Sequence, residues 1–245
     1  MSFAFLPSIN TMTQAMTQAI SKTKENDMHH NTDDLIHNPS TRCPCMLVLD
    51  TSASMSGEPI NELNDGLLRF VQSTQQDESA AYSVELGIIS AGGSVREIMP
   101  FTCVADIREV HAMQASGNTP LGSAVSLALQ RLDERKQAYK DNGVPYFQPW
   151  LVIISDGAPT DEYLAAANQA RTLSANRKLV SLPIGVQGAD LSLLGEFSSK
   201  PALPLKGLHF GEFFEWLSQS MSRVSGSNSS ASDVQLPSVS PWTTI

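Results

Sequence analysis

Oxygen-bearing side chains alternate directly after the first strongly apolar stretch of the sequence. In the segment Asp50-Thr51-Ser52-Ala53-Ser54, every second residue carries a carboxylate or a hydroxyl group. This alternation across a tight turn allows all three side chains to point into one crevice. Carboxylate and hydroxyl oxygens are donors that hard divalent cations prefer. The segment is therefore a candidate metal site.

Two later segments carry side chains of the same kind. Asp156 ends the second strongly buried strand that the sequence predicts, residues 150–156, and Gly157 beside it allows the backbone to turn sharply. Thr119 stands just before a predicted helix. Because open α/β sheets bind ligands at the carboxyl ends of their strands, we expect these segments to converge. The predicted metal ligands are Asp50, Ser52, Ser54, Thr119 and Asp156.

The donor set narrows the choice of metal. Two carboxylates and three hydroxyls include no soft donor, which favours Mg²⁺, with Mn²⁺ and Ca²⁺ as alternatives, over zinc or copper. Such a site leaves coordination positions for water or an outside ligand, and its residual positive charge would attract a carboxylate. The structural alternative is that Ser52, Ser54 and Thr119 only cap helices, as these residue types often do. The joint placement of three segments, each at the loop edge of a βα unit, favours the metal.

The surrounding pattern predicts the elements that position these residues. Continuous apolar runs indicate strands buried on both faces, as in a parallel sheet covered by helices. We expect an α/β fold with an open, doubly wound, Rossmann-like and mostly parallel sheet and one antiparallel edge strand. The antiparallel strand follows a turn at residues 91–94 that is too short for anything but a hairpin. Strands are predicted over residues 45–50, 83–90, 95–101, 150–156 and 179–186, and helices from 59, over 119–139, over 161–174 and over 210–224.

The chain divides into three predicted parts. Residues 1–41 are expected to form a flexible N-terminal arm, residues 42–224 one α/β domain, and residues 225–245 a Ser-rich flexible tail. Trp242 is an unexpected residue for a simple linker. Pro183 disfavours a central position for its strand, because proline removes a hydrogen bond from the sheet. We therefore expect that strand near an edge, and any sixth strand around residues 203–205 to be short.

Composition excludes several classes of partner. The formal net charge is −9, from 16 basic and 25 acidic residues, and nucleic acids or anionic membranes require a basic face. The three cysteines lack disulfide-framework spacing, which suggests a reducing compartment. The N-terminus has no signal-peptide pattern, and no apolar stretch approaches the roughly 20 residues of a membrane span. We expect a soluble cytoplasmic protein.

Three segments resemble the three motifs of von Willebrand factor A (VWA) domains, which together form the metal-ion-dependent adhesion site of that family. They are residues 50–60 (DTSASMSGEPI), 117–122 (GNTPLG) and 155–161 (SDGAPTD). The closest resemblance is to the bacterial TerY-like branch, which is associated with tellurium resistance, and it includes FFEWL at residues 213–217. The likeness covers roughly residues 42–224. One departure is Ala53, where family members often carry glycine.

The resemblance implies roles and partners. Ser52, Ser54 and Thr119 would be direct or near-direct ligands, and Asp50 and Asp156 would bind the metal directly or through water. TerY-like proteins are often found beside a protein kinase and a PP2C-type phosphatase in stress-related gene clusters. The resemblance therefore implies an adaptor that binds a protein partner through an acidic residue of that partner.

Catalysis is the main alternative to binding. A serine nucleophile needs a base and an orienting third group, but the five histidines lie in the N-terminal arm or in predicted loops without a telling acid. No G-x-S-x-G segment is present, and no glycine-rich phosphate loop follows the first strand. A metal-dependent hydrolase or phosphatase at the same site stays as the alternative, because a metal and acids can activate water. We expect a binding module and not an enzyme.

Overall fold

The computed structural model describes residues 35, 38–227 and 234–243. The chain divides into two units, Met1–Pro39 and Ser40–Ile245. The predicted flexible arm, residues 1–41, lies almost wholly outside the described residues, so its flexibility stays a prediction. The following description concerns the second unit.

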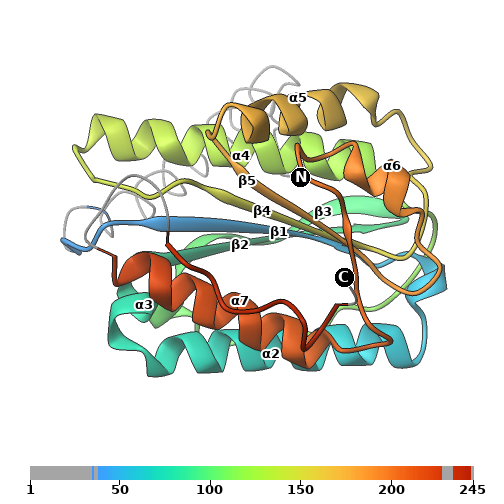
Figure 1. The fold of residues 1–245 in the computed structure, drawn as a ribbon, viewed down its shortest axis with the longest axis horizontal. Helices are drawn as coiled ribbons and strands as arrows, with labels where there is room; N and C mark the ends of the chain where they lie inside the picture. The colour runs from blue at the N-terminus through green and yellow to red at the C-terminus, as the bar shows by residue number, and fades with distance from the viewer. Residues whose placement is uncertain (1–34, 36–37, 228–233, 244–245) are drawn as a thin grey trace, which may run out of the picture. The chain divides into compact units, whose positions relative to one another are not determined.

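A six-stranded sheet, with the order β3-β2-β1-β4-β5-β6, forms the centre of this unit (Figure 1). All neighbouring strands run parallel except β2 and β3, which are antiparallel. The predicted α/β class, the mostly parallel sheet and the antiparallel edge hairpin are therefore confirmed. The strands are β1 (Cys43–Asp50), β2 (Val84–Gly92), β3 (Ser94–Cys103), β4 (Trp150–Ser155), β5 (Val180–Gly185) and β6 (Leu203–Pro204).

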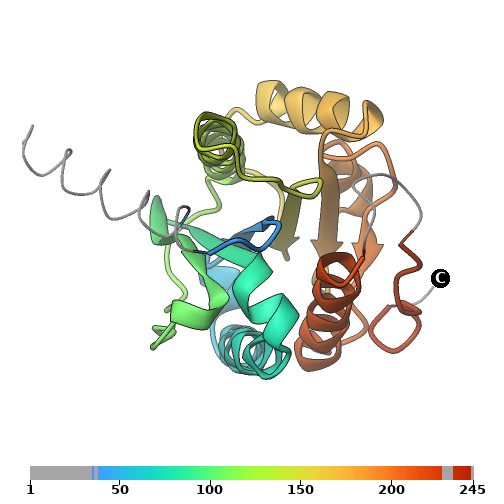
Figure 2. The ribbon, with the colours of Figure 1, turned by 90° about the vertical axis from the view of Figure 1, so that its left-hand side faces the viewer.

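Helices cover both faces of the sheet, which the view along the strands shows directly (Figure 2). On one face lie α2 (Glu58–Gln76), α3 (Glu78–Ser83) and α7 (Phe210–Ser225). On the other face lie α4 (Leu121–Asp141), α5 (Leu164–Ala175) and α6 (Leu191–Gly195). Two short 3₁₀ turns, η1 (Ala53–Met55) and η2 (Val104–Asp106), follow β1 and β3.

The side chains of β1 explain why residues 45–49 are all apolar. Cys45, Leu47 and Leu49 belong to the core that includes α2 and α7, whereas Met46 and Val48 belong to the core that includes α4 and α5. Successive residues of a strand point to opposite faces, so a strand between two helical layers needs apolar side chains on both. This is the layer arrangement that the apolar runs predicted.

The prediction from Pro183 agrees with the topology. The strand β5 is next to the last, and the edge strand β6 has only two residues. These residues pair with Ile184 and Gly185 and leave Pro183 outside the β5–β6 ladder. Two short helices, α3 and α6, were not predicted, and α4 and α5 begin two to three residues later than expected.

The C-terminal segment departs from the predicted flexible tail over residues 225–245. Residues 234–243 pack against α7 and β6, and Trp242 is 0% exposed. Its ring lies 5.0 Å from Phe213 and 5.3 Å from Trp216 between ring centroids. The backbone amide of Lys206 donates a hydrogen bond of 2.8 Å to the carbonyl of Trp242. For residues 234–243 the prediction is corrected, because the apolar side chains of the segment complete the core beside α7.

No helix within the described ranges has the length and apolar character that crossing a membrane requires.

Candidate metal centre

The five predicted ligands gather where the strand order of the sheet reverses direction. The strand β1 continues to β2 on one side, while β4, which comes later in the chain, pairs with its other side. Asp50 is the last residue of β1, and Asp156 directly follows β4. A crevice forms at such a switch point because the connections from the two strands leave in opposite directions. The topology therefore brings the two carboxylates to one edge of the sheet.

Asp50 is the most buried member of the set, with no exposed surface. One carboxylate oxygen, Oδ1, accepts a hydrogen bond of 2.8 Å from the amide of Ser52. The other, Oδ2, accepts one of 2.5 Å from the hydroxyl of Ser155. Burial raises the pKa of Asp50, an effect that the hydrogen bonds from Ser155 and Ser52 oppose and the charge of Asp156 reinforces. A cation beside the carboxylate would favour its charged form.

A chain of hydrogen bonds joins the first loop to the third. The hydroxyls of Ser52 and Ser54 lie 2.9 Å apart, and the hydroxyl of Ser54 donates to Oδ1 of Asp156 over 2.9 Å. Ser52 is buried, Ser54 is exposed, and Asp156 is intermediate. The oxygens therefore run from the protein interior to its surface, where an outside ligand has access.

Backbone hydrogen bonds hold the second loop against the first. The amide of Ser116 donates to the carbonyl of Thr51 over 2.8 Å, and the amide of Ala53 donates to that of Gly117 over 2.9 Å. Gly117 has a φ of +68°, and a Cβ atom there would lie 2.4 Å from the Cα of Gly93. Only glycine combines this conformation with so close an approach. Ala53 needs no such freedom, because Arg177 is the only described non-glycine residue with a positive φ.

Thr119 faces the loop that carries Asp156. Its side chain is only 5% exposed, and its Oγ1 atom would lie 3.8 Å from a Cβ placed on Gly157. Within the described part of the chain, its hydroxyl makes no hydrogen bond. The hydroxyl is therefore free to bind a ligand in the crevice.

The helix-cap alternative does not account for these hydroxyls. Ser52 precedes η1 without a side-chain cap, and Ser54 bonds to Asp156 instead. The N-cap position of α4 is occupied by Pro120, not Thr119. None of the three hydroxyls that sequence reasoning selected is engaged in capping.

Two residues with a place in this network were not predicted. Ser155 was assigned to the strand and to the third motif but not to the ligand network, although it donates to Asp50. Asp161 was placed at the start of a helix, but it lies before α5 and accepts hydrogen bonds from the first turn of α4. A Ser-Asp pair ending a strand was the available signal for Ser155. Asp161 closes the third motif, SDGAPTD, but its contact spans almost forty residues of sequence, so the motif does not reveal its partner.

The side chains fit a hard cation. The five residues bring together two carboxylates and three hydroxyls, and all of these donors are oxygen atoms. In the ranges that the structure describes, no group of three or more histidine, cysteine, aspartate or glutamate side chains could hold a metal. Mg²⁺ accepts sites with one or two carboxylates and retains water as further ligands. Coordination by these residues stays a prediction.

Solved structures share this fold at low sequence identity. The pilus adhesin SpaC from Lactobacillus rhamnosus GG has a TM-score of 0.61 at 12% identity, over 75% of this chain and 30% of that one. A von Willebrand factor type A protein from Catenulispora acidiphila has a TM-score of 0.56 at 12% identity, over 75% and 43%. Proximal thread matrix protein 1 from the mussel byssus, with a zinc-occupied MIDAS motif, has a TM-score of 0.53 at 15% identity, over 75% and 48%.

The chain spans less than half the length of each of these structures. No curated protein matches the chain. The von Willebrand factor type A domain model matches residues 45–214, which include every predicted ligand. With the doubly wound sheet and three converging loops already described, this match shows that the chain belongs to the von Willebrand factor type A domain family.

Proposed function

We propose that this protein is a metal-dependent protein–protein interaction module. Asp50, Ser52, Ser54, Thr119 and Asp156 would hold a divalent cation, and a carboxylate from a partner protein would complete its coordination. The observation that carries the proposal is the convergence of these oxygen donors from three loops, with the Thr119 hydroxyl left free. The cation supplies a Lewis-acid centre that accepts a carboxylate oxygen.

Mg²⁺ is the proposed metal, with Mn²⁺ and Ca²⁺ as alternatives. The all-oxygen donor set supports this choice. The mussel protein with a zinc-occupied MIDAS motif makes zinc a necessary competitor in any binding test. The affinities of the protein for these ions should be compared at equal free concentrations.

The proposed biological role is that of an adaptor. The resemblance to the TerY-like branch supports a bacterial stress-response or signalling system, associated with tellurium resistance, that includes a kinase and a PP2C-type phosphatase. The sequence support is the extended first motif, SGEPI at residues 56–60, and the FFEWL stretch at residues 213–217. The acidic balance of the chain agrees with a protein partner and not with nucleic acid.

The metal proposal is tested by binding calorimetry and thermal unfolding. Mg²⁺ or Mn²⁺ should raise the melting temperature of the wild type, because a ligand that binds only the folded state stabilises it. Asp156→Ala should lose this increment while remaining folded. The matched control is Ser56→Ala, an exposed serine of the same loop outside the predicted ligand set. Absence of both heat and thermal shift at millimolar concentrations of these ions contradicts the proposal.

The interaction proposal is tested with candidate partners encoded beside this chain. Binding of a purified kinase or phosphatase should require the metal, should fail with a chelator, and should fail for Asp156→Ala. One acidic residue of the partner should be indispensable. Equal binding by wild type and variant, with and without chelator, excludes the metal site as the recognition surface. Metal-dependent hydrolysis of p-nitrophenyl phosphate that Asp156→Ala abolishes would instead support the hydrolase alternative.

A further inference from the structure

The first turn of α4 is capped by a residue from another part of the chain. Helices begin with backbone amides that have no partner within the helix, and Pro120 at the N-cap of α4 provides no side-chain acceptor. Asp161 instead accepts hydrogen bonds from two of these amides. Its Oδ1 accepts from the amide of Gly122 over 2.9 Å, and its Oδ2 accepts from the amide of Ser123 over 2.8 Å. The hydroxyl of Ser123 also donates to Oδ2, over 2.6 Å.

Further contacts join the same two loops. The amide of Thr160 donates a hydrogen bond of 2.9 Å to the carbonyl of Thr119. A Cβ atom on Gly122 would lie 2.3 Å from the carbonyl oxygen of Glu162. The first turn of α4 is therefore in close contact with the backbone of the third loop. The loop that begins at Asp156 is therefore fastened to the residues on both sides of Pro120. We name this set of contacts, made by residues 160–162 with residues 119–123, the α4 latch.

The latch has two consequences for the metal centre. It ties Thr119 to the loop that carries Asp156, because the amide of Thr160, in that loop, donates to the carbonyl of Thr119. It also removes the need for a local cap, because threonine and serine hydroxyls near helix starts otherwise bind the free amides. The Thr119 hydroxyl then stays available for a cation.

We propose that Asp161 is a positioning residue of the metal centre, which holds Thr119 in place through the α4 latch without touching the cation. This inference rests on the proposed metal site. Residues that orient metal ligands without binding the metal typically change metal affinity by about 10–100-fold when they are replaced. Asp161→Ala should weaken Mg²⁺ and Mn²⁺ binding within this range, and Asp161→Asn, which keeps an acceptor oxygen, should weaken it less.

The matched control is Asp190→Ala. Asp190 also caps a helix start, but locally, as the N-cap residue of α6, with Oδ1 accepting from the amides of Ser192 and Leu193 over 3.0 and 3.1 Å. That helix carries none of the predicted ligands. Both alanine variants lose a helix cap, but only Asp161→Ala should change metal affinity. Calorimetric titration of the full chain with Mg²⁺ and with Mn²⁺ measures the dissociation constants.

Hydrogen exchange of the metal-free protein provides a second measurement. Asp161→Ala should accelerate exchange at the amides of Gly122, Ser123 and Thr160, and Asp190→Ala should not. If the wild type binds the metals and Asp161→Ala binds them within twofold of the wild type, the positioning role is wrong while the metal site stands. If the wild type binds neither metal, both proposals fail. Unchanged exchange at Thr160 would also overturn the positioning role, since the latch would then not hold Thr119.

Discussion

At the scale of single residues, the five predicted ligands are not equivalent. Both oxygens of Asp50 already accept hydrogen bonds within the protein, whereas the Thr119 hydroxyl accepts and donates none in the described part of the chain. Replacing Asp50 therefore disturbs the fold as well as the site. Replacing Thr119 should affect the site alone, which makes it the cleaner probe of metal binding.

Thr119→Val should separate metal affinity from stability. Valine keeps the branched shape and removes only the hydroxyl, so no buried hydrogen bond is lost and the free energy of unfolding should change by less than about 1 kcal/mol. Metal affinity should fall at least about tenfold, and Thr119→Ser, which keeps the hydroxyl, should retain most of it. Calorimetry and urea denaturation measure the two effects. Equal affinity in the valine and serine variants would remove Thr119 from the ligand set.

Ser155→Ala should lower stability even in the absence of metal. The change removes the donor to Oδ2 of Asp50, a fully buried carboxylate. Leaving a buried acceptor without its partner costs about 1–3 kcal/mol. Urea denaturation in chelator measures this loss, with Ser56→Ala as the exposed control. A loss no larger than that of the control would show that the Ser155 hydroxyl does not support Asp50.

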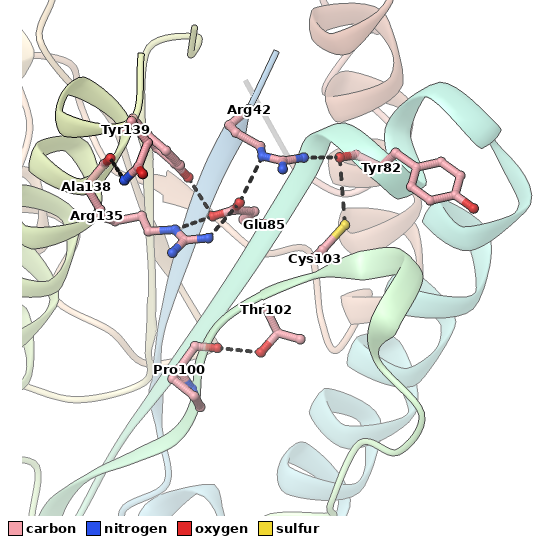
Figure 3. A network of polar contacts seen from close by, with 10 residues as sticks. Arg42, Tyr82, Glu85, Pro100, Thr102, Cys103, Arg135, Ala138 and Tyr139 are labelled. Carbon is pink, nitrogen blue, oxygen red and sulfur yellow. Dashed lines mark hydrogen bonds and ion pairs between the residues drawn. The ribbon is translucent and has the colours of Figure 1, made fainter. Parts of the chain in front are cut away.

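At the scale of secondary-structure elements, α4 connects the candidate metal centre to the opposite end of the sheet. Its first turn is held by Asp161. Near its other end, Arg135 and Tyr139 bond to the buried carboxylate of Glu85 at the start of β2 (Figure 3). Arg42, just before β1, pairs with the same carboxylate over 3.2 Å. The first turn of α4 thus contacts the loop beside the candidate metal centre, whereas its last turns contact the buried carboxylate of Glu85.

The cap that Asp161 provides for α4 should make the free energy of unfolding depend on pH. Burial acts to raise the pKa of Asp161, but the hydrogen bonds from Ser123 and Gly122 outweigh it, so the pKa is lowered. A lowered folded-state pKa contributes stability above the unfolded value, about 3.9, and this contribution is lost as pH falls through the folded value. Asp161→Asn should therefore reduce the free energy of unfolding at pH 6 and reduce it less near pH 3. Urea denaturation of the wild type and the variant across this pH range tests the prediction. A difference in the free energy of unfolding that does not change with pH would contradict it.

Glu85→Gln should be strongly destabilising. The change leaves the buried guanidinium groups of Arg42 and Arg135 without their carboxylate, and breaking a buried ion pair on one side costs about 3–5 kcal/mol. Glu97→Gln is the control, because Glu97 pairs with Arg131 at a partly exposed position, where such pairs contribute at most about 1 kcal/mol. Chemical denaturation measures both losses. Metal affinity of folded Glu85→Gln should equal that of the wild type, since the cluster lies at the other end of the strands.

At the scale of the whole molecule, the C-terminal segment is part of the domain. Trp216 donates from its indole nitrogen to the carbonyl of Pro237 over 3.0 Å, and Arg223 donates to that of Gln235 over 2.7 Å. The backbone of Thr243 forms an antiparallel bridge with Leu205, just beyond the short edge strand β6. Residues 234–243 therefore cover the edge of the sheet and one side of α7.

Trp242→Ala should release this segment. Removing a fully buried tryptophan typically costs about 3–5 kcal/mol, and residues 234–243 should then become sensitive to protease while they are protected in the wild type. Trp242→Phe, which keeps an aromatic ring against Phe213, should retain most of the protection. Mass spectrometry of timed digests identifies the cleavage sites. Rapid cleavage of this segment in the wild type would contradict the packing.

The sequence by itself determined the long strands and the main helices, and it selected the five candidate ligands. The runs at residues 45–49 and 150–154 are apolar at every position because both faces of β1 and β4 are buried, and this pattern is visible in a short window. Asp50 and Asp156 could be selected because each follows such a run. The hairpin of β2 and β3 followed from the length of its turn.

Only the tertiary structure decided which contacts unite these parts. The bonds of Asp161 to α4, of Ser155 to Asp50 and of Trp242 to Phe213 join residues that are distant in sequence. Hydrogen bonds and ring contacts act over a few ångströms in space, whereas sequence patterns record only neighbours along the chain. The two short helices α3 and α6 were missed for a related reason, because segments of five or six residues have no resolvable period and depend on packing for their stability.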